Sequence, residues 1–340
     1  MVFGKTLTRV KELQTEGRLS TSVARAFLSK KPFRKLVYTK AYKKIYNKVI
    51  EKKTKNLSEH PEHFIIETTN YCNAKCIMCP HKTMIRSKGI MPMELFKKIV
   101  DDIVQNFQPK SFCVSGFGEP ILDKELFEKI KYLKSKTNTK VKIFSNGALL
   151  IENNAKTLVE SGLDEINISL NAANPESYKH IMGGLNYDFT LKNIANLLEE
   201  KQRQKSKKPF IALSLVQLKE NEKEIQDFAK QWGSKVDALR ICSTQNWAGA
   251  MDFGADFKQP KFACVRVWED FYVMWNGQVT ACCRDYEGKL VLGDLNNQTI
   301  KEVVNSLVYK DLQQKHLQGK IDEVEICKNC DAPLDPITWW

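Results

Sequence analysis

The chain has 340 residues, which is enough for one barrel-sized domain and a smaller one. Its content of 42% hydrophobic and 27% charged residues is typical of a folded soluble protein, and no run of about 18 apolar residues predicts a membrane-spanning helix. Residues 1–60 hold 16 Lys and Arg against 4 Asp and Glu, so they carry nearly all of the net charge of +13. The nearly neutral remainder argues against a protein built to bind nucleic acid.

Residues 1–60 are predicted to form a basic amphipathic helical extension. Tyr38, Tyr42, Ile45 and Val49 recur at helical spacing, while lysines occupy the other faces. One interpretation is a helical clamp on the body. The other is contact with an anionic membrane surface or a phosphate group. Because the chain starts without the apolar core of a signal peptide, we expect a cytoplasmic protein, with peripheral membrane contact as an option.

Residues 61–245 alternate between strand and helix patterns, which predicts a parallel α/β architecture of six units. Such folds place their sites at the carboxyl ends of the strands. The predicted strands are 64–69, 111–115, 140–145, 166–170, 210–217 and 237–242, and the predicted helices are 93–106, 123–136, 153–161, 175–182, 189–204 and 222–232.

Three of the ten cysteines, Cys72, Cys76 and Cys79, follow the first predicted strand on one loop. Ten cysteines in a cytosolic chain indicate metal or redox chemistry rather than disulfides. A tetrahedral zinc site needs a fourth ligand, which His81 or a distant cysteine could supply. A [4Fe–4S] cluster with one iron left open to a small molecule is the other interpretation.

The Cys-x3-Cys-x2-Cys spacing resembles the signature of radical S-adenosylmethionine (SAM) enzymes, in which SAM chelates the open iron. That resemblance implies a partial (β/α)6 TIM-type barrel and reductive cleavage of SAM to a 5′-deoxyadenosyl radical. It is strengthened by Gly116-Phe117-Gly118-Glu119-Pro120, which is similar to the family's GGEP-type motif, and by polar residues at later strand ends. The implied SAM contacts are Met78, Gly116, Gly118, Glu119, Ser145, Asn146 and Ser169. The Arg expected near Met182 is missing.

A second cysteine set consists of Cys264, Cys282, Cys327 and Cys330, near a hairpin signal at Asn276-Gly277 that predicts a type I′ turn. By spacing alone, four such thiolates suit zinc or an iron–sulfur cluster equally well. Residues 264–331 resemble the SPASM/twitch extension of radical SAM enzymes, so we expect an auxiliary domain at 246–340. No cysteine follows Cys330, which favours the version with one auxiliary [4Fe–4S] cluster.

The resemblance implies an oxidoreductase that takes hydrogen from a hydroxyl-bearing substrate such as a sugar, an aminocyclitol or a nucleotide- or lipid-linked sugar. The auxiliary cluster would accept an electron, and a flavodoxin or ferredoxin would serve as reductant. Arg240 and Asp285, with Arg284, are candidates to orient the hydroxyl group; a surface ion pair is the alternative for them. Cys283 is the candidate hydrogen donor of an epimerase.

Two further functions stay open. The same extension occurs in peptide maturases, although residues 1–60 do not resemble a peptide-recognition domain. A zinc-stabilised nucleic-acid binder is the third, but it leaves the ordered strand-end motifs unexplained. Cys113 and Cys242 lie within strand patterns and are predicted to be core residues.

Overall fold

The computed structural model describes residues 60–254 and 261–332, together with residues 46, 48, 50–52, 54 and 55. The chain divides into two compact units. The barrel unit comprises Pro61–Thr244 and Asp270–Val303, and the second unit comprises Met1–His60, Gln245–Glu269 and Val304–Trp340. The prediction for residues 1–60 therefore lies almost wholly outside the described residues. None of the described helices has the length and hydrophobicity needed to cross a membrane.

One nine-stranded sheet forms the frame of the barrel unit, in the order β11-β10-β9-β1-β3-β4-β5-β7-β8. Its strands from β1 to β8 are parallel to one another, as an open barrel requires. This confirms the predicted partial TIM-type barrel. The bounds are β1 His63–Ile66, β3 Ser111–Cys113, β4 Lys140–Ser145, β5 Glu165–Ser169, β7 Phe210–Val216 and β8 Ala238–Cys242.

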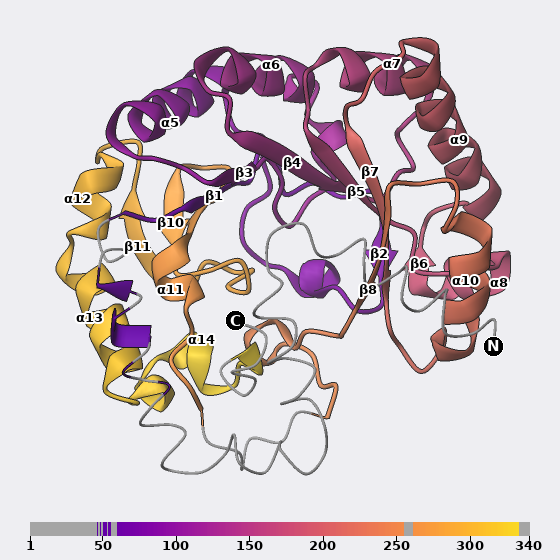
Figure 1. Cartoon of the computed structure of the whole chain (residues 1–340). Coiled ribbons are helices and arrows are strands. Elements are labelled where there is room, and N and C mark those ends of the chain that lie inside the picture. The colour runs from indigo at the N-terminus through magenta and orange to yellow at the C-terminus, as the bar shows by residue number, and fades with distance from the viewer. Residues whose placement is uncertain are drawn as a thin grey trace. The chain divides into compact units, whose positions relative to one another are not determined.

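Helices cover the outer face of these strands (Figure 1). Each forms because apolar residues recur on one side. In the helix Met93–Asn106, for example, four apolar side chains are buried: Phe96, Ile99, Val100 and Ile103. The helices are α5 Met93–Asn106, α6 Leu126–Lys136, α7 Glu152–Glu160, α8 Pro175–Ile181, α9 Tyr187–Arg203 and α10 Ile225–Trp232. Short 3-10 helices lie at Pro80–Thr83, Pro120–Leu122, Glu222–Glu224, Trp247–Gly249 and Ile321–Glu323.

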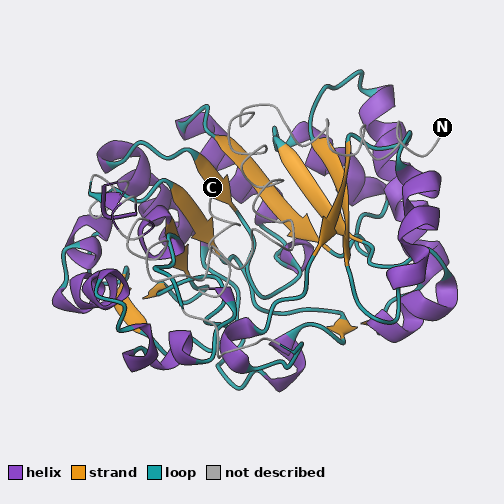
Figure 2. Cartoon of the chain, turned by 60° about the horizontal axis from the view of Figure 1, so that its bottom comes forward, coloured by secondary structure: helices purple, strands orange, loops and turns teal. Residues whose placement is uncertain are grey.

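The opposite face of the sheet, which we call the inner face, is polar. Along β4, Val141 and Ile143 are fully buried, whereas Lys142 is half-buried and Phe144 is 40% exposed. Because side chains alternate along a strand, Lys142 and Phe144 share the face opposite to the helices. Figure 2 distinguishes the strands of this sheet by colour from the helices and loops around them.

A hairpin extends the sheet beyond β1. Strand β9 (Asp270–Val273) pairs in parallel with β1, β10 (Gln278–Thr280) pairs antiparallel with β9, and β11 (Val291–Asp294) closes the edge. The predicted hairpin is confirmed, but its predicted type I′ turn is wrong. The Gly277 N–H donates to Met274 O (2.9 Å), and only Gly277 has a positive φ (88°) in this turn. That pattern is a type I turn followed by a glycine bulge.

The hairpin also changes the domain layout. The prediction assigned all of 246–340 to one auxiliary domain, whereas Asp270–Val303 belongs to the barrel unit. The physical reason is the backbone pairing of β9 with β1, which joins this segment to the sheet. Helix α12 (Ile300–Val304) follows β11 and ends at the boundary between the units.

The second unit is described through α11 (Arg266–Glu269), α13 (Leu307–Leu317) and α14 (Glu325–Lys328). Asn246 ties its parts together: its side-chain amide donates to Asn329 O (2.6 Å) and its Oδ1 accepts from the Asp331 N–H (3.1 Å). The Tyr46 hydroxyl donates to Ala263 O (3.0 Å), which links two segments of this unit.

Replacement of Lys129 by Met should destabilise the barrel unit. Its ammonium donates to Asp123 Oδ2 and to Met91 O, both at 2.6 Å, and the Lys129 and Asp123 side chains are at most 1% exposed. The variant leaves a buried carboxylate without its cation, at a cost of about 3–5 kcal/mol. We expect a lower urea midpoint by circular dichroism, while the exposed neighbour variant Lys131→Met keeps the wild-type midpoint. Equal midpoints for both variants would contradict the buried pair.

Candidate active site

The loop that carries the first three cysteines is held by a short two-stranded sheet. Strand β2 (Lys75–Cys76) pairs antiparallel with β6 (Met182–Gly183), and the Ile77 N–H donates to Ile181 O at 3.0 Å. Cys76 Sγ lies 3.5 Å from Met182 Sδ. The turn after α8 therefore fixes the middle of the cysteine loop.

The three thiols lie close enough to influence one another. Burial and the thiols of Cys79 and Cys72 raise the pKa of Cys76 to about 12, and burial followed by Cys72 raises the pKa of Cys79 to about 11. No three His, Cys, Asp or Glu side chains in the described ranges are close enough to hold a single metal ion. A cluster makes no such demand, because each thiolate binds a different iron. The arrangement fits an iron–sulfur cluster with three protein ligands.

The glycine-rich loop after β3 packs against the backbone that leads into Cys72. A Cβ atom at Gly118 would lie 2.4 Å from Thr69 O and 2.6 Å from Tyr71 O, so only glycine allows this approach. The Glu119 N–H donates to Tyr71 O at 2.8 Å. The predicted motif is thus brought beside the cysteine loop.

Glu119 is the central carboxylate of this region. Its side chain accepts hydrogen bonds from the Ser145 hydroxyl (2.8 Å) and the Asn146 N–H (2.7 Å), at the end of β4. Burial raises the pKa of Glu119 to about 7, although these hydrogen bonds oppose the shift. Three predicted SAM contacts, Glu119, Ser145 and Asn146, therefore form one hydrogen-bonded group.

Further strand-end residues lie around the same loop. The Asn146 amide donates to Asn73 Oδ1 at 2.7 Å, which links β4 to the cysteine loop. Asn171, just after β5, donates to Met182 Sδ at 3.1 Å, and Ser169 accepts from the Ser214 hydroxyl at 3.5 Å. Met78 is buried, and its predicted contact with adenine stays a prediction.

In place of the Arg expected near Met182, the chain has a tightly packed turn. The Met182 side chain is buried between Cys76 and Asn171, and a Cβ atom at Gly183 would lie 3.1 Å from Lys75 O. Gly184 has a φ of +89°. This turn is adapted to pack closely on the cysteine loop.

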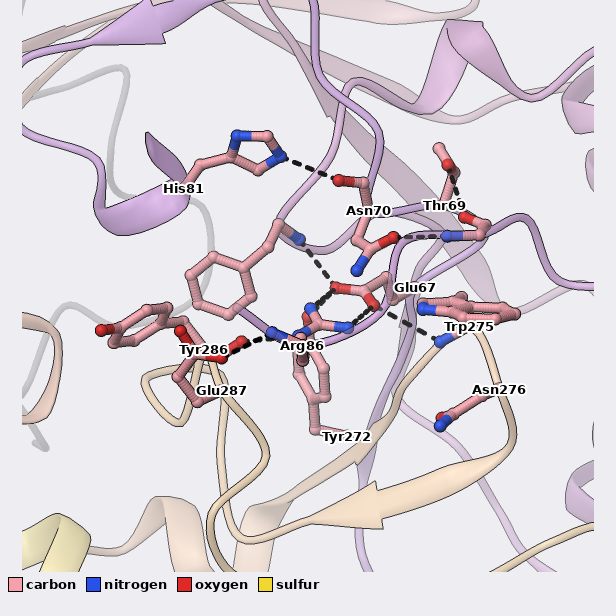
Figure 3. Close-up of polar contacts among 12 residues, drawn as sticks. Glu67, Thr69, Asn70, His81, Arg86, Tyr272, Trp275, Asn276, Tyr286 and Glu287 are labelled. Atoms are coloured by element: carbon pink, nitrogen blue, oxygen red, sulfur yellow. Dashed lines mark hydrogen bonds and ion pairs between the residues drawn. The ribbon is translucent and has the colours of Figure 1, made fainter. Parts of the chain in front are cut away.

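A buried ion pair that the sequence reasoning missed organises the other side of the site (Figure 3). Arg86 donates to both oxygens of Glu67, at 2.8 and 2.7 Å, and the Glu67 side chain is fully buried. Glu67 also accepts from the Phe117 N–H (3.0 Å), the Tyr272 hydroxyl (3.0 Å) and the Trp275 N–H (3.4 Å). One carboxylate thus connects the end of β1, the glycine-rich loop and the hairpin.

Arg86 extends this network to the segment after the second cysteine. Its Nε donates to Tyr286 O at 2.6 Å, and its backbone N–H donates to Glu287 Oε2 at 3.0 Å. The position of Glu67 directly after the first predicted strand was the available signal. Its partner could not be read from the sequence, because Arg86 lies 19 residues away.

His81, the alternative fourth ligand, is turned to the backbone. Its Nε2 lies 2.8 Å from Asn70 O, an acceptor, so Nε2 carries the proton. That nitrogen is occupied by a structural hydrogen bond.

The inner face holds the predicted residue Arg240 in an ion pair with Glu165 (2.6 Å), which Lys140 also contacts at 2.6 Å. The described residues place no carboxylate within ion-pair distance of Lys142; its ammonium lies 5.6 Å from the Phe144 ring centroid. The neighbouring amide of Asn167 is 4% exposed, and its Oδ1 lacks a hydrogen-bond partner. Asn167 therefore has an unsatisfied amide oxygen beside the half-buried cation of Lys142, and the sequence reasoning missed both residues.

The Asp285 carboxylate forms its hydrogen bonds within its own turn. Its oxygens accept from the Thr280 hydroxyl and from the N–H groups of Lys289 and Leu290, both at 2.9 Å. The predicted substrate contacts of Asp285 and Arg240 stay predictions, and the structure gives both residues protein partners.

The adjacent cysteines differ in their surroundings. The Arg284 N–H donates to Cys282 Sγ at 3.4 Å. Burial raises the pKa of Cys113 on β3, and the Cys283 thiol raises it further. Cys283 is therefore near the inner face. Cys113 is buried as predicted, whereas the prediction for Cys242 is wrong, because this last residue of β8 is exposed.

The second unit gathers three of the four predicted auxiliary ligands. His316 on α13 accepts from the Cys264 N–H (3.1 Å) and lies 3.5 Å from Cys327 Sγ, and the Cys330 N–H donates to Cys327 O (3.2 Å). All three cysteines are buried. Cys282 lies in the barrel unit, so its place in the same ligand set stays a prediction.

Two family models match the chain. One, described as the radical SAM superfamily, matches residues 66–231, and the other, described as an iron–sulfur cluster-binding SPASM domain, matches residues 264–331. Both cysteine groups fall within these ranges. The two matches imply a SAM-binding [4Fe–4S] cluster and auxiliary iron–sulfur clusters as cofactors.

Curated relatives match over part of their length. The chain is 29% identical over 185 residues to the tungsten-containing aldehyde ferredoxin oxidoreductase cofactor-modifying protein of Pyrococcus furiosus, covering 53% of this chain and 51% of that protein. It is 33% identical over 137 residues to a probable GTP 3′,8-cyclase of Methanococcus maripaludis, covering 40% of this chain and 45% of that protein. The chain spans about half the length of the curated relatives it matches.

Solved structures share the fold. BtrN in complex with AdoMet and 2-DOIA is similar with a TM-score of 0.57 at 18% identity, over 80% of this chain and 93% of that chain. Streptococcus suis SuiB bound to the precursor peptide SuiA is similar with a TM-score of 0.59 at 15% identity, over 78% of this chain and 70% of that chain.

SAM affinity should depend on the charge of Glu119. If its carboxylate holds the methionyl amine, a protonated Glu119 must first lose its proton, so affinity should fall about tenfold per pH unit below 7. We expect anaerobic equilibrium dialysis of the reconstituted protein to show this slope, and Glu119→Gln to bind weakly without it. The exposed variant Glu128→Gln should keep the wild-type profile. A wild-type affinity that does not change between pH 5.5 and 8 would rule out this role.

Proposed function

Because the chain belongs to the radical SAM superfamily and carries a C-terminal SPASM domain, we propose that it is an oxidoreductase acting on a hydroxyl-bearing small molecule. When bound, the cluster and SAM supply a 5′-deoxyadenosyl radical that takes a hydrogen atom from the substrate. Cys72, Cys76 and Cys79 would hold that cluster, and the group around Glu119 would hold SAM. The substrate class that we propose is a sugar, an aminocyclitol or a nucleotide- or lipid-linked sugar.

The polar groups of the inner face support a polar substrate. Asn167 pairs in register with Phe144, and Lys142 pairs with Glu165, so the four side chains are neighbours on β4 and β5. A buried amide oxygen without a partner costs free energy, which a substrate hydroxyl group could recover by donating to it. Lys142 could donate to a substrate oxygen, and the exposed Phe144 ring offers an apolar surface. This buried, unpaired amide is the observation that carries the proposal.

The second cysteine set supports dehydrogenation. A cluster held by Cys264, Cys282, Cys327 and Cys330 has no iron left for substrate, so its role would be to accept the electron released when the alcohol becomes a carbonyl. A flavodoxin or ferredoxin would reduce the SAM cluster.

An epimerase is the second candidate, favoured by one observation. Cys283 lies near Cys113 of β3 and near Tyr272 of β9, two residues of the inner face. A thiol in that position could return a hydrogen atom to a substrate radical. In deuterated water, deuterium at an inverted carbon that disappears in Cys283→Ala would establish the epimerase, whereas a carbonyl product from both proteins would establish the dehydrogenase.

The two cysteine groups should have separable functions. Cys72→Ala should abolish SAM cleavage, because it removes a ligand of the SAM cluster. Cys282→Ala should still form 5′-deoxyadenosine without substrate oxidation, since it affects only the auxiliary set. Chromatography of 5′-deoxyadenosine and product from anaerobic reactions measures both. If Cys282→Ala oxidises substrate at the wild-type rate, the auxiliary cluster has no part in turnover.

Lys142→Met should impair substrate use and spare SAM cleavage. We expect the kcat/KM for deuterium transfer from labelled substrate to 5′-deoxyadenosine to fall at least tenfold, because a charge-assisted hydrogen bond contributes about 1.5–3 kcal/mol. Lys97→Met, on the outer helix α5, is the matched control and should behave as the wild type. An unchanged kcat/KM in Lys142→Met would place the substrate elsewhere.

A further inference from the structure

His316 joins two cysteines of the second unit that are 63 residues apart in the chain. Its imidazole is fully buried on α13 and lies edge-on to Trp268, with 6.2 Å between ring centroids. Nδ1 lies 3.1 Å from the backbone nitrogen of Cys264, and Nε2 lies 3.5 Å from Cys327 Sγ. Both ring nitrogens are therefore directed at the proposed ligand set.

The backbone contact fixes where the ring proton lies. The Cys264 N–H can only donate, so Nδ1 must be the nitrogen with the lone pair. In a neutral imidazole the proton is then on Nε2, which faces sulfur. With the proton there, Nε2 is a hydrogen-bond donor and is unable to ligate iron at the same time. Because Nδ1 accepts the hydrogen bond from the Cys264 N–H, it carries no proton itself, so the ring is neutral.

We propose that His316 is a positioning residue that donates an Nε2–H hydrogen bond to the Cys327 thiolate and raises the reduction potential of the auxiliary cluster. The inference rests on the proposed assignment of Cys264 and Cys327 as cluster ligands. Reduction adds negative charge to a cluster and its sulfurs, so a donor to a ligand sulfur stabilises the reduced form more than the oxidised form.

A higher potential suits the proposed dehydrogenation. The auxiliary cluster would have to accept an electron from a substrate radical, and a hydrogen bond at Cys327 favours that transfer. The contact to Cys264 adds a second effect, because it fixes the ring orientation so that the proton stays directed at sulfur. His316 would thus act on the cluster without contacting the substrate.

The test uses the full chain with Cys72, Cys76 and Cys79 replaced by Ala, so that only the auxiliary cluster remains. In this background, His316→Phe keeps an aromatic ring beside Trp268 but removes both hydrogen bonds, whereas His316→Gln can still accept and donate. His180→Phe, an exposed histidine of the barrel unit, is the matched control. The midpoint potential is measured by redox titration followed by electron paramagnetic resonance.

We expect a more negative midpoint potential in His316→Phe, a smaller shift in His316→Gln and none in His180→Phe. An unchanged potential in His316→Phe with a full iron content overturns the inference and leaves the ligand assignment intact. Loss of all iron in the Cys72, Cys76 and Cys79 background instead overturns the auxiliary cluster itself, and with it the inference.

A second measurement uses the protein with His316 intact, in case His316→Phe does not retain its cluster. After labelling of the histidines with nitrogen-15, pulsed electron paramagnetic resonance of the reduced auxiliary cluster should show one weak histidine coupling and an exchangeable proton. If His180→Phe shows the same weak coupling, the coupling does not come from His180. A strong coupling typical of an iron-bound nitrogen, or no histidine coupling, overturns the inference.

Discussion

The ion pair between Glu67 and Arg86 is the interaction on which the barrel unit's site depends. A fully buried carboxylate is costly unless it is paired and hydrogen-bonded, and Glu67 meets that condition through Arg86, Tyr272 and the Phe117 N–H. These partners come from three separate segments of the chain. Because each must be in place to satisfy the same charge, the carboxylate fixes the position of the glycine-rich loop and of the hairpin that leads to Cys282.

The outer face of the sheet contributes to stability, and the inner face carries polar groups available to ligands. The outer face buries Val141, Ile143 and their counterparts under helices, and this burial of apolar area provides most of the stabilising free energy. The inner face carries amide, ammonium and hydroxyl groups, and among the described residues the Asn167 Oδ1 lacks a protein partner. Parallel strands bring these groups to one edge, where Glu119 and the cysteine loop also lie. A rigid apolar layer therefore supports polar groups that remain available to ligands.

The cysteines of the second unit are positioned by different contacts from those of the barrel unit. One buried imidazole, that of His316, contacts both Cys264 and Cys327. An apolar shell that includes Trp268 excludes water from this ring, which strengthens its hydrogen bonds. In the barrel unit, by contrast, the cysteine loop depends on backbone pairing between β2 and β6.

The sequence by itself determined the local features. Period-two and period-3.6 patterns placed β4 at 140–145 and α5 at 93–106, the bounds that the structure has, and cysteine spacing singled out both sets of predicted cluster ligands. Such signals are local, because strand and helix periodicity is set within a few residues. Only the tertiary structure decided which charges pair, since Arg240 meets Glu165 and Arg86 meets Glu67. It also decided that, among the described residues, the buried Asn167 Oδ1 has no hydrogen-bond partner. Partners of buried charges are chosen by strand order and loop packing, which join residues far apart in the chain and leave no periodic trace in it.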